Sequence, residues 1–185
     1  MSNEILVENC APTLAGLKTG SLFSCPCPDR RQLMREVRDF NRAMRSRGLL
    51  LVPLRYSERR VLLYLYRPAS LRRDLSTRRA RAILDRVGYA GLEGAQCVSR
   101  LKRRLGESGD FPHEIGLFLG YPPEDVLGFM ENHAQNSKFT GYWKVYGDEA
   151  AARRTFEQYK SCTDAYCRSL RAGARLEQLA VSEHL

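Results

Sequence analysis

The stretch LLLVPLRYSERRVLLYLYR, residues 49–67, decides the fold class of this chain. Two apolar runs, Leu49 to Arg55 and Arg60 to Arg67, flank four polar residues, a pattern typical of a β-hairpin with a short loop. Both runs are almost continuously apolar, so we expect strands that are covered on both faces. Pro53 has no amide hydrogen to donate, which places the first strand at a sheet edge or beside a bulge.

Helical patterns occupy most of the chain on either side of this hairpin. In the clearest of them, Leu33, Val37, Phe40 and Met44 recur at three and four residues after the capping residue Asp29. We expect helices over residues 29–46, 72–87, 93–107, 123–133 and 148–170.

The remaining segments are short. We expect strands at Ile5 to Val7, Ile115 to Leu119 and Tyr142 to Tyr146, and a first short helix over Ala11 to Leu17 with Pro12 in its first turn. The elements predict an α+β fold: one domain over residues 1–185, with a small mixed or antiparallel sheet packed against about five or six helices. Residues 174–185 are expected to form a flexible or lightly docked tail.

The composition excludes several classes of protein. Of the 185 residues, 43% are apolar and 28% are charged, a balance typical of one globular domain and unlike that of a disordered chain. No apolar run reaches about 20 residues, the length that a membrane-spanning helix needs. Residues 1–8 lack the basic region of a secretory signal, so we expect a cytoplasmic protein without a membrane partner.

The net charge of +9 comes mainly from arginines between Arg30 and Arg104. Such an excess is compatible with nucleic acid or another anionic partner. It is equally compatible with a solvated basic surface that binds nothing, because net charge by itself describes solubility and long-range attraction.

Two motifs, Pro112-His113-Glu114 and Leu119-Gly120-Tyr121-Pro122, resemble those of a bacterial family, the domain of unknown function three-seven-nine-three. The segments Cys10 to Lys18 and Gly141 to Tyr146 and the chain length are also similar, so the resemblance extends over essentially the whole chain. The family has no assigned activity. The chain is similar to proteins of anaerobic bacteria, and the resemblance suggests a role in anaerobic redox or iron metabolism.

A cysteine and a histidine form the first candidate site. Cys10 lies at the start of the helix expected over residues 11–17, where the helix dipole would lower the pKa of a thiol. His113 could act as a general base toward Cys10, with Glu114 orienting its ring, as in a thiol-dependent hydrolase or transferase. The alternative is that Cys10 is buried and that His113 bonds backbone groups at the entrance to a strand.

The segment Cys25-Pro26-Cys27-Pro28 forms the second candidate site, and its two prolines predict an exposed loop. Two thiolates in such a loop suit a soft metal ion or the iron of haem. Two thiols do not complete a site, and Cys10 or His113 could supply a third ligand. The alternative is a proline-rich turn with incidental cysteines.

The third candidate site is an anion site around Lys18. The segment Gly16 to Ser21 lacks the glycine positions of a Walker A motif. The backbone amides from Thr19 to Ser21 can still form an anion-binding nest beside the Lys18 ammonium. Lys18, Thr19 and Ser21 are therefore candidate contacts to a phosphate-bearing ligand.

The strand expected from Tyr142 to Tyr146 interleaves aromatic rings with Lys144, a pattern that single-strand nucleic-acid binders use for stacking. Since alternate residues of a strand face opposite sides, either the Trp143 side or the Lys144 side is expected to be core. Tyr121, Trp143 and Lys144 complete the set of candidate ligand contacts.

The sequence thus favours a protein that binds a small anionic ligand or cofactor, such as haem, a metal ion or a phosphate-bearing molecule. A thiol-dependent enzyme is the second hypothesis and a nucleic-acid-binding module the third. The proposed site requires that the segment around Cys10 and the corner at His113 line the same cavity.

Overall fold

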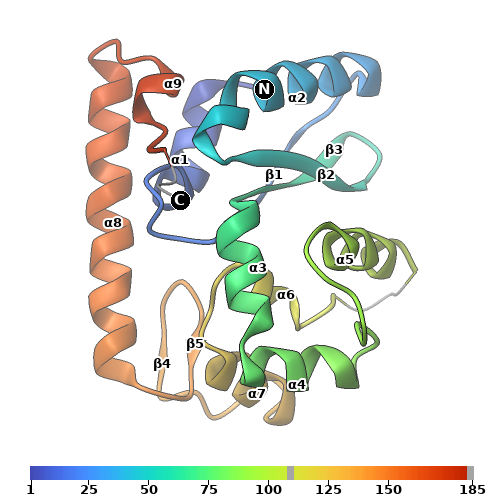
Figure 1. Cartoon of the computed structure of the whole chain (residues 1–185). Helices are drawn as coiled ribbons and strands as arrows, with labels where there is room; N and C mark the ends of the chain where they lie inside the picture. Colours follow the sequence, from blue (N-terminus) through green and yellow to red (C-terminus); the bar gives the residue numbers. More distant parts are fainter. Residues whose placement is uncertain (108–110, 183–185) are drawn as a thin grey trace.

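A three-stranded antiparallel sheet lies near the centre of the computed structural model, which describes residues 1–107 and 111–182 (Figure 1). Its strands are β1 (Gly20–Pro26), β2 (Leu50–Tyr56) and β3 (Arg60–Tyr66), in the order β1-β3-β2. The predicted β2–β3 hairpin is confirmed. Pro53 lies on the edge strand β2, next to a shift in register, as expected for a residue that cannot donate a ladder hydrogen bond.

One face of the sheet is covered by α1 (Asn3–Leu14) and α2 (Arg30–Met44), and the long α8 (Glu149–Arg171) packs along α1. The 3-10 turn η1 (Arg45–Arg47) follows α2, and the short α9 (Leu176–Leu179) also contributes to this layer. Its apolar core includes Leu63 and Leu65 of β3, which alternate with residues that point to the other face.

The other face of the sheet packs on a second layer, whose core takes residues from α3 (Pro68–Ser76), α4 (Arg78–Arg86), α5 (Ala95–Glu107), α6 (Ile115–Phe118) and α7 (Pro123–Glu131). Within this layer α5 contacts β2, and α4 packs on α3 and α7. Tyr64 and Tyr66 of β3 belong to this layer, where their rings stack at 4.7 Å. Both faces of the hairpin are therefore covered, which explains the continuous apolarity of its strands.

A third, smaller core joins the hairpin of β4 (Phe139–Thr140) and β5 (Lys144–Val145) to the first half of α8. Its members are Trp143, Val145, Ala152, Phe156 and Tyr159. The α+β prediction with a small antiparallel sheet is thus confirmed, and the described residues form nine α-helices, more than expected.

Two predicted strands are wrong because they are helical. Ile5 to Val7 lies inside α1, where Leu6, Cys10 and Leu14 repeat every four residues on the buried side. Ile115 to Leu119 lies in and just after α6, and since all of these residues are buried, no polar side marked the helical period.

Other boundaries also differ from the prediction. The segment 24–28 is not an exposed loop: β1 continues to Pro26, and an edge strand tolerates proline there. The helix expected over residues 72–87 is two helices, because Thr77 has an extended backbone and its hydroxyl caps α4. The strand expected from Tyr142 to Tyr146 spans only two residues.

The segment after Gly173 is docked on the molecule. Leu176 and Ala180 are buried, and the Val181 amide donates to the Leu14 carbonyl oxygen at 3.0 Å. Residues 183–185 of the expected tail lie outside the described residues. Within residues 1–107 and 111–182, no helix combines the length and the apolarity that a membrane span requires.

Candidate functional site

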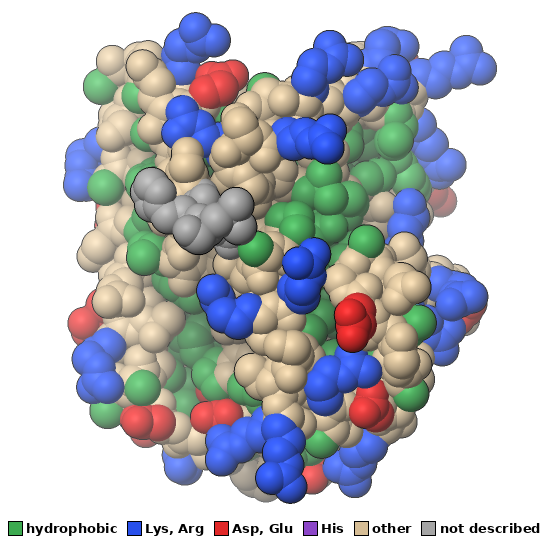
Figure 2. Space-filling model, viewed as in Figure 1, with side chains coloured by type: hydrophobic (Ala, Val, Ile, Leu, Met, Phe, Trp, Pro, Cys, Tyr) green, Lys and Arg blue, Asp and Glu red, His purple; other side chains and the backbone are tan. Residues whose placement is uncertain are grey.

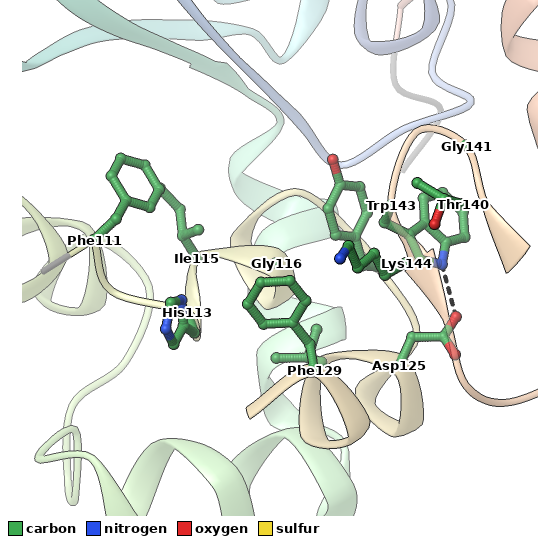
Figure 3. A pocket seen from close by; sticks show the side chains of 12 residues that line it. Phe111, His113, Ile115, Gly116, Asp125, Phe129, Thr140, Gly141, Trp143 and Lys144 are labelled. Carbon is green, nitrogen blue, oxygen red and sulfur yellow. Dashed lines mark hydrogen bonds between the residues drawn. The ribbon is translucent and has the colours of Figure 1, made fainter. Parts of the chain in front are cut away.

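A cavity of about 340 Å³ lies between the segment leading into α6, helix α7 and the β4–β5 hairpin (Figure 3). In Figure 3, Phe111 and His113 lie on one side of the cavity, and Thr140, Trp143 and Lys144 lie on the other. We call it the aromatic pocket, because five rings line it: Phe111, His113, Tyr121, Phe129 and Trp143.

Asp125 on α7 links this helix to the segment of the β4–β5 hairpin. One carboxylate oxygen accepts from the Trp143 indole at 2.7 Å, and the other accepts from the backbone amides of Tyr146 at 2.8 Å and Gly147 at 2.7 Å. The side chain is buried, and three donors satisfy its charge. Asp125 therefore holds the pocket in shape and leaves little acceptor capacity for a ligand.

Two glycines let the walls approach one another. A Cβ atom on Gly116 would lie 2.7 Å from a methyl group of Val126, so only glycine allows α6 to pack this closely on α7. A Cβ atom on Gly141 would lie 2.3 Å from the Phe156 ring, which lies behind the hairpin. Both glycines therefore help to determine the shape of the pocket.

A stack of aromatic rings anchors the far wall. Tyr121 and Trp143 stack at 4.7 Å, and the ring of Phe156 on α8 meets Trp143 edge-on at 4.4 Å. Such pairs stabilise a single arrangement beyond the area they bury. The face that a ligand would meet is therefore preorganised.

The open polar groups of the pocket are His113, Thr140 and Lys144. His113 is exposed, and its ring meets the Phe129 ring edge-on at 5.0 Å. Lys144 is half-buried and its ammonium donates to the Ala134 carbonyl oxygen at 2.6 Å, which leaves two of its three protons for other acceptors. These groups are suited to donate to a ligand.

Lys18 lies behind the pocket wall, in the turn between α1 and β1. Its ammonium lies 5.3 Å from the centre of the Tyr121 ring and 5.9 Å from that of Tyr159. Burial lowers the pKa of this ammonium to about 8, and the nearby Cys10 opposes this shift. Among the described residues Lys18 has no carboxylate partner, so at neutral pH it places a positive charge next to the pocket.

Cys10 does not line the pocket. It lies inside α1 rather than at the start of a helix, it is fully buried in the layer opposite to α6, and burial raises the pKa of its thiol. Its expected activation by a helix dipole is therefore wrong. In the N-terminal segment it is Lys18 that contacts the pocket wall, through Tyr121. Cys10 and His113 lie in different layers of the molecule.

The Glu114 carboxylate does not point toward the His113 ring and so is not placed to orient it. It is buried, and its Oε1 lies 2.8 Å from Arg104 Nε and accepts from the Tyr89 hydroxyl at 3.0 Å. The carboxylate thus ties the start of α6 to α5, while the adjacent His113 faces the pocket.

Thr19 and Ser21 do not form an open nest. Both are buried; the Thr19 hydroxyl donates to Asp74, and the Ser21 hydroxyl shares a hydrogen bond of 2.9 Å with Thr13. Ser21 also lies in β1, opposite Leu65 of β3. These groups hold the start of β1, and Lys18 alone of this candidate set remains near the pocket.

Cys25 and Cys27 are buried in the layer of α1 and α2, and burial raises the pKa of Cys25. In the part of the chain that the structure describes, no group of three or more His, Cys, Asp or Glu side chains is placed to hold a metal ion. The cysteine pair thus lies away from the aromatic pocket, and the described residues around it do not form a metal-binding cluster.

Sequence reasoning placed His113, Tyr121, Trp143 and Lys144 among the candidates, and the structure brings these four together. It missed Phe111, Phe129, Asp125 and Thr140. Asp125 and Phe129 are four residues apart and therefore share one side of α7, but such a spacing occurs in any helix and does not by itself indicate a site.

A family model described as "Protein of unknown function (DUF3793)" matches residues 6–180 of the chain. Neither a curated protein nor a solved structure matches the chain. The family match covers both core layers and the whole described part of the aromatic pocket.

Proposed function

The chain belongs to the DUF3793 family, and we propose that its aromatic pocket binds a small, flat organic acid. The observation that carries this proposal is that rings line the cavity while its open polar groups, His113, Thr140 and Lys144, can all donate hydrogen bonds. Small-molecule sites commonly combine apolar walls with a few convergent polar groups.

The size of the cavity limits the ligand. Its volume of about 340 Å³ is near the lower end of the usual range for ligand sites, about 300–1,000 Å³. One or two fused rings with a short acidic substituent fit this space. A haem macrocycle needs more room, so of the anionic ligands that the sequence suggested, a small acid is favoured over haem.

The charges around the cavity favour an acid over a neutral ring. Lys144 retains two free ammonium protons, and Lys18 adds a positive charge behind Tyr121. Asp125, the acid in the wall, already accepts three hydrogen bonds. A ligand carboxylate would therefore meet donors at the pocket rim and aromatic faces deeper inside.

The thiol-dependent enzyme is the less favoured hypothesis. A buried Cys10 with a raised pKa has little thiolate at neutral pH, and His113 lies in a different layer. Binding in the aromatic pocket needs neither residue to act as a nucleophile or a base.

Trp143 provides a direct test, because it is the only tryptophan in the chain and lines the pocket. Benzoate and 2-naphthoate, each paired with its uncharged amide, should be titrated by calorimetry, with Trp143 emission and the melting temperature as further readouts. We expect the acids to change the emission and raise the melting temperature, since a ligand that binds the native state stabilises it by mass action.

The variant Lys144→Met tests the charge contact, and Lys138→Met is its control. Lys138 is exposed on the same segment, donates to the Gly147 carbonyl oxygen at 2.8 Å and does not line the pocket. We expect Lys144→Met to weaken acid binding about tenfold or more and to leave amide binding unchanged. Equal binding of acids and amides by the wild-type protein, or no binding of either, would reject the proposal.

A further inference from the structure

A second concave surface lies where the end of α2 meets the starts of β2 and α3. It encloses about 450 Å³ and is lined mainly by Arg38, Asn41, Arg42, Arg45, Leu50 and Pro68. We call it the arginine groove. None of its lining residues belongs to the aromatic pocket, so the two surfaces are independent.

The three arginines of the groove carry positive charge that carboxylates leave largely unneutralised. All three are exposed; within residues 1–107 and 111–182 only Arg42 has an ion pair, a contact of 3.8 Å with the exposed Asp39. Exposed pairs of this kind are weak. Arg38 and Arg42 are four residues apart on one side of α2, a rise of about 6 Å, and Arg45 follows three residues later at the start of η1.

The backbone at the floor of the groove is already occupied. Asn41 donates to the Leu51 carbonyl oxygen at 2.9 Å and accepts from the Leu51 amide at 2.7 Å. Two residues further along β2, Pro53 has no amide hydrogen. The edge of β2 is therefore unsuited to receive an added strand, and a peptide that binds by strand addition is a poor partner for this surface.

The positive charge continues along α2 beyond the groove. Arg30, Arg31 and Arg35 extend it toward the start of the helix, and Glu36, one of two acids in α2, is paired with the N-terminal amine at 2.5 Å. Figure 2 shows basic side chains crowded along the upper edge of the molecule, over α2, with an apolar surface below them. The helix of 15 residues is about 22 Å long, an extent that suits a row of anionic groups better than one small anion.

We propose that the arginine groove and the exposed side of α2 bind the phosphate backbone of a nucleic-acid strand. Arginine matches the geometry of phosphate oxygens and can bind them in a bidentate way. No aromatic ring lines the groove, so the contacts are made to phosphates and not to stacked bases. Binding is therefore sequence-independent and strongly dependent on salt.

The test uses the full chain, a fluorescent 20-nucleotide strand and anisotropy at several salt concentrations. The variant Arg38→Gln/Arg42→Gln/Arg45→Gln lowers the net charge from +9 to +6. Its control, Arg154→Gln/Arg168→Gln/Arg171→Gln, lowers the charge equally, with exposed residues of α8. We expect the groove variant to lose at least tenfold in affinity at low salt and about two units of salt slope, since each lost phosphate contact removes about 0.7.

Equal losses in the two variants would overturn the proposal, because net charge would then explain binding without a groove. A charge-preserving variant, Arg38→Lys/Arg42→Lys/Arg45→Lys, guards against a loss of fold and should retain most of the salt slope. The proposal is also rejected if millimolar inorganic phosphate displaces the fluorescent strand as effectively as the same strand without its label does. Binding of phosphatidylserine vesicles without binding of the strand would reject it as well. Lys144→Met should leave strand binding unchanged, which separates this result from any failure of the pocket.

Discussion

The corner between α1 and β1 and the aromatic pocket both contain reactive or charged residues, but only the pocket leaves them available. In the corner, which we define as Cys10, Thr13, Ser21 and Arg67, each side chain is buried. The Thr13 and Ser21 hydroxyls bond to each other, and Arg67 donates to backbone carbonyls. In the pocket, His113 and Lys144 retain free donor capacity.

This difference teaches that residue type is a poor guide to function unless the state of its hydrogen bonds is known. A buried polar group with all of its partners stabilises the fold, whereas a half-exposed one with free donors can bind something else. The comparison predicts that substitutions in the corner change stability and leave binding intact, and that substitutions of open pocket residues do the reverse.

The largest effect is expected for Arg67→Met. The guanidinium of Arg67 donates to the carbonyl oxygens of Thr13 at 2.8 Å, Leu14 at 2.7 Å, Val181 at 2.8 Å and Arg47 at 3.1 Å. Its removal would take a charge-assisted hydrogen bond from each of these carbonyls, although those of Thr13 and Leu14 still accept from the Gly16 and Val181 amides, and we expect a loss of about 3–5 kcal/mol in the free energy of unfolding. Urea unfolding at neutral pH measures this loss, and one below about 1 kcal/mol would contradict the structural role of the corner.

Asp125→Asn should have the next largest effect and should act on the pocket wall. An asparagine can still accept from the Tyr146 and Gly147 amides, but its NH₂ group would then face the Trp143 indole N–H, so that two donors meet. We expect about 2–3 kcal/mol of destabilisation and a red shift of the Trp143 emission. Unchanged emission together with full stability would show that Asp125 does not organise the pocket.

Lys18→Met should stabilise the protein, in contrast to the two changes above. The folded-state pKa of Lys18 is lowered by burial to about 8 from an ordinary 10.5. Below pH 8 the folded state carries a poorly solvated ammonium, whereas the unfolded chain holds the same ammonium in water, and this difference lowers the free energy of unfolding. The destabilisation disappears as the pH rises from the folded-state pKa to the unfolded-state pKa, because the folded state then holds a neutral amine.

At pH 7 we therefore expect Lys18→Met to add about 1–2 kcal/mol of stability, a figure reduced because solvent still reaches the side chain. The difference from the wild-type protein should shrink toward zero between pH 8 and pH 10. Denaturant unfolding of both proteins at pH 6, 7, 8, 9 and 10 measures it, and a difference that does not change with pH would contradict the buried ammonium.

Much of the fold was predictable from local pattern. The hairpin of β2 and β3 followed from two apolar runs and a polar loop, and the irregularity near Pro53 followed from its missing amide hydrogen. The helix at residues 3–14 was predicted only in part, as a helix over residues 11–17, because Pro12 favours a helix start and the apolar run at residues 5–7 resembles a short strand. In the structure Leu6, Cys10 and Leu14 repeat every four residues on the buried side, and Pro12 lies in the last turn of the helix instead of the first.

The site was less predictable, because its residues come from segments that meet only in the folded chain. His113, Tyr121, Trp143 and Lys144 were selected for their chemistry, and nothing in the local sequence says that they line one cavity. The pairing of Cys10 with His113 failed for the same reason: the sheet separates their layers. Topology at long range decides which candidate residues meet.

The smallest effect comes from a matched pair of substitutions, Thr13→Val in the corner and Thr140→Val in the pocket. The two changes remove the same hydroxyl from sites that differ in burial: Thr13 is fully buried and bonds Ser21 at 2.9 Å, whereas Thr140 is exposed and lies 3.4 Å from the Ser137 hydroxyl. Because Thr13→Val leaves the buried Ser21 hydroxyl without this partner, we expect it to cost about 1 kcal/mol, whereas Thr140→Val should change stability by less than about 0.5 kcal/mol. Titration with 2-naphthoate should give the opposite order, with Thr140→Val weakening binding modestly and Thr13→Val leaving it unchanged. If both variants lose equal stability, burial does not distinguish the two regions, and the argument that separates a structural corner from a binding pocket fails.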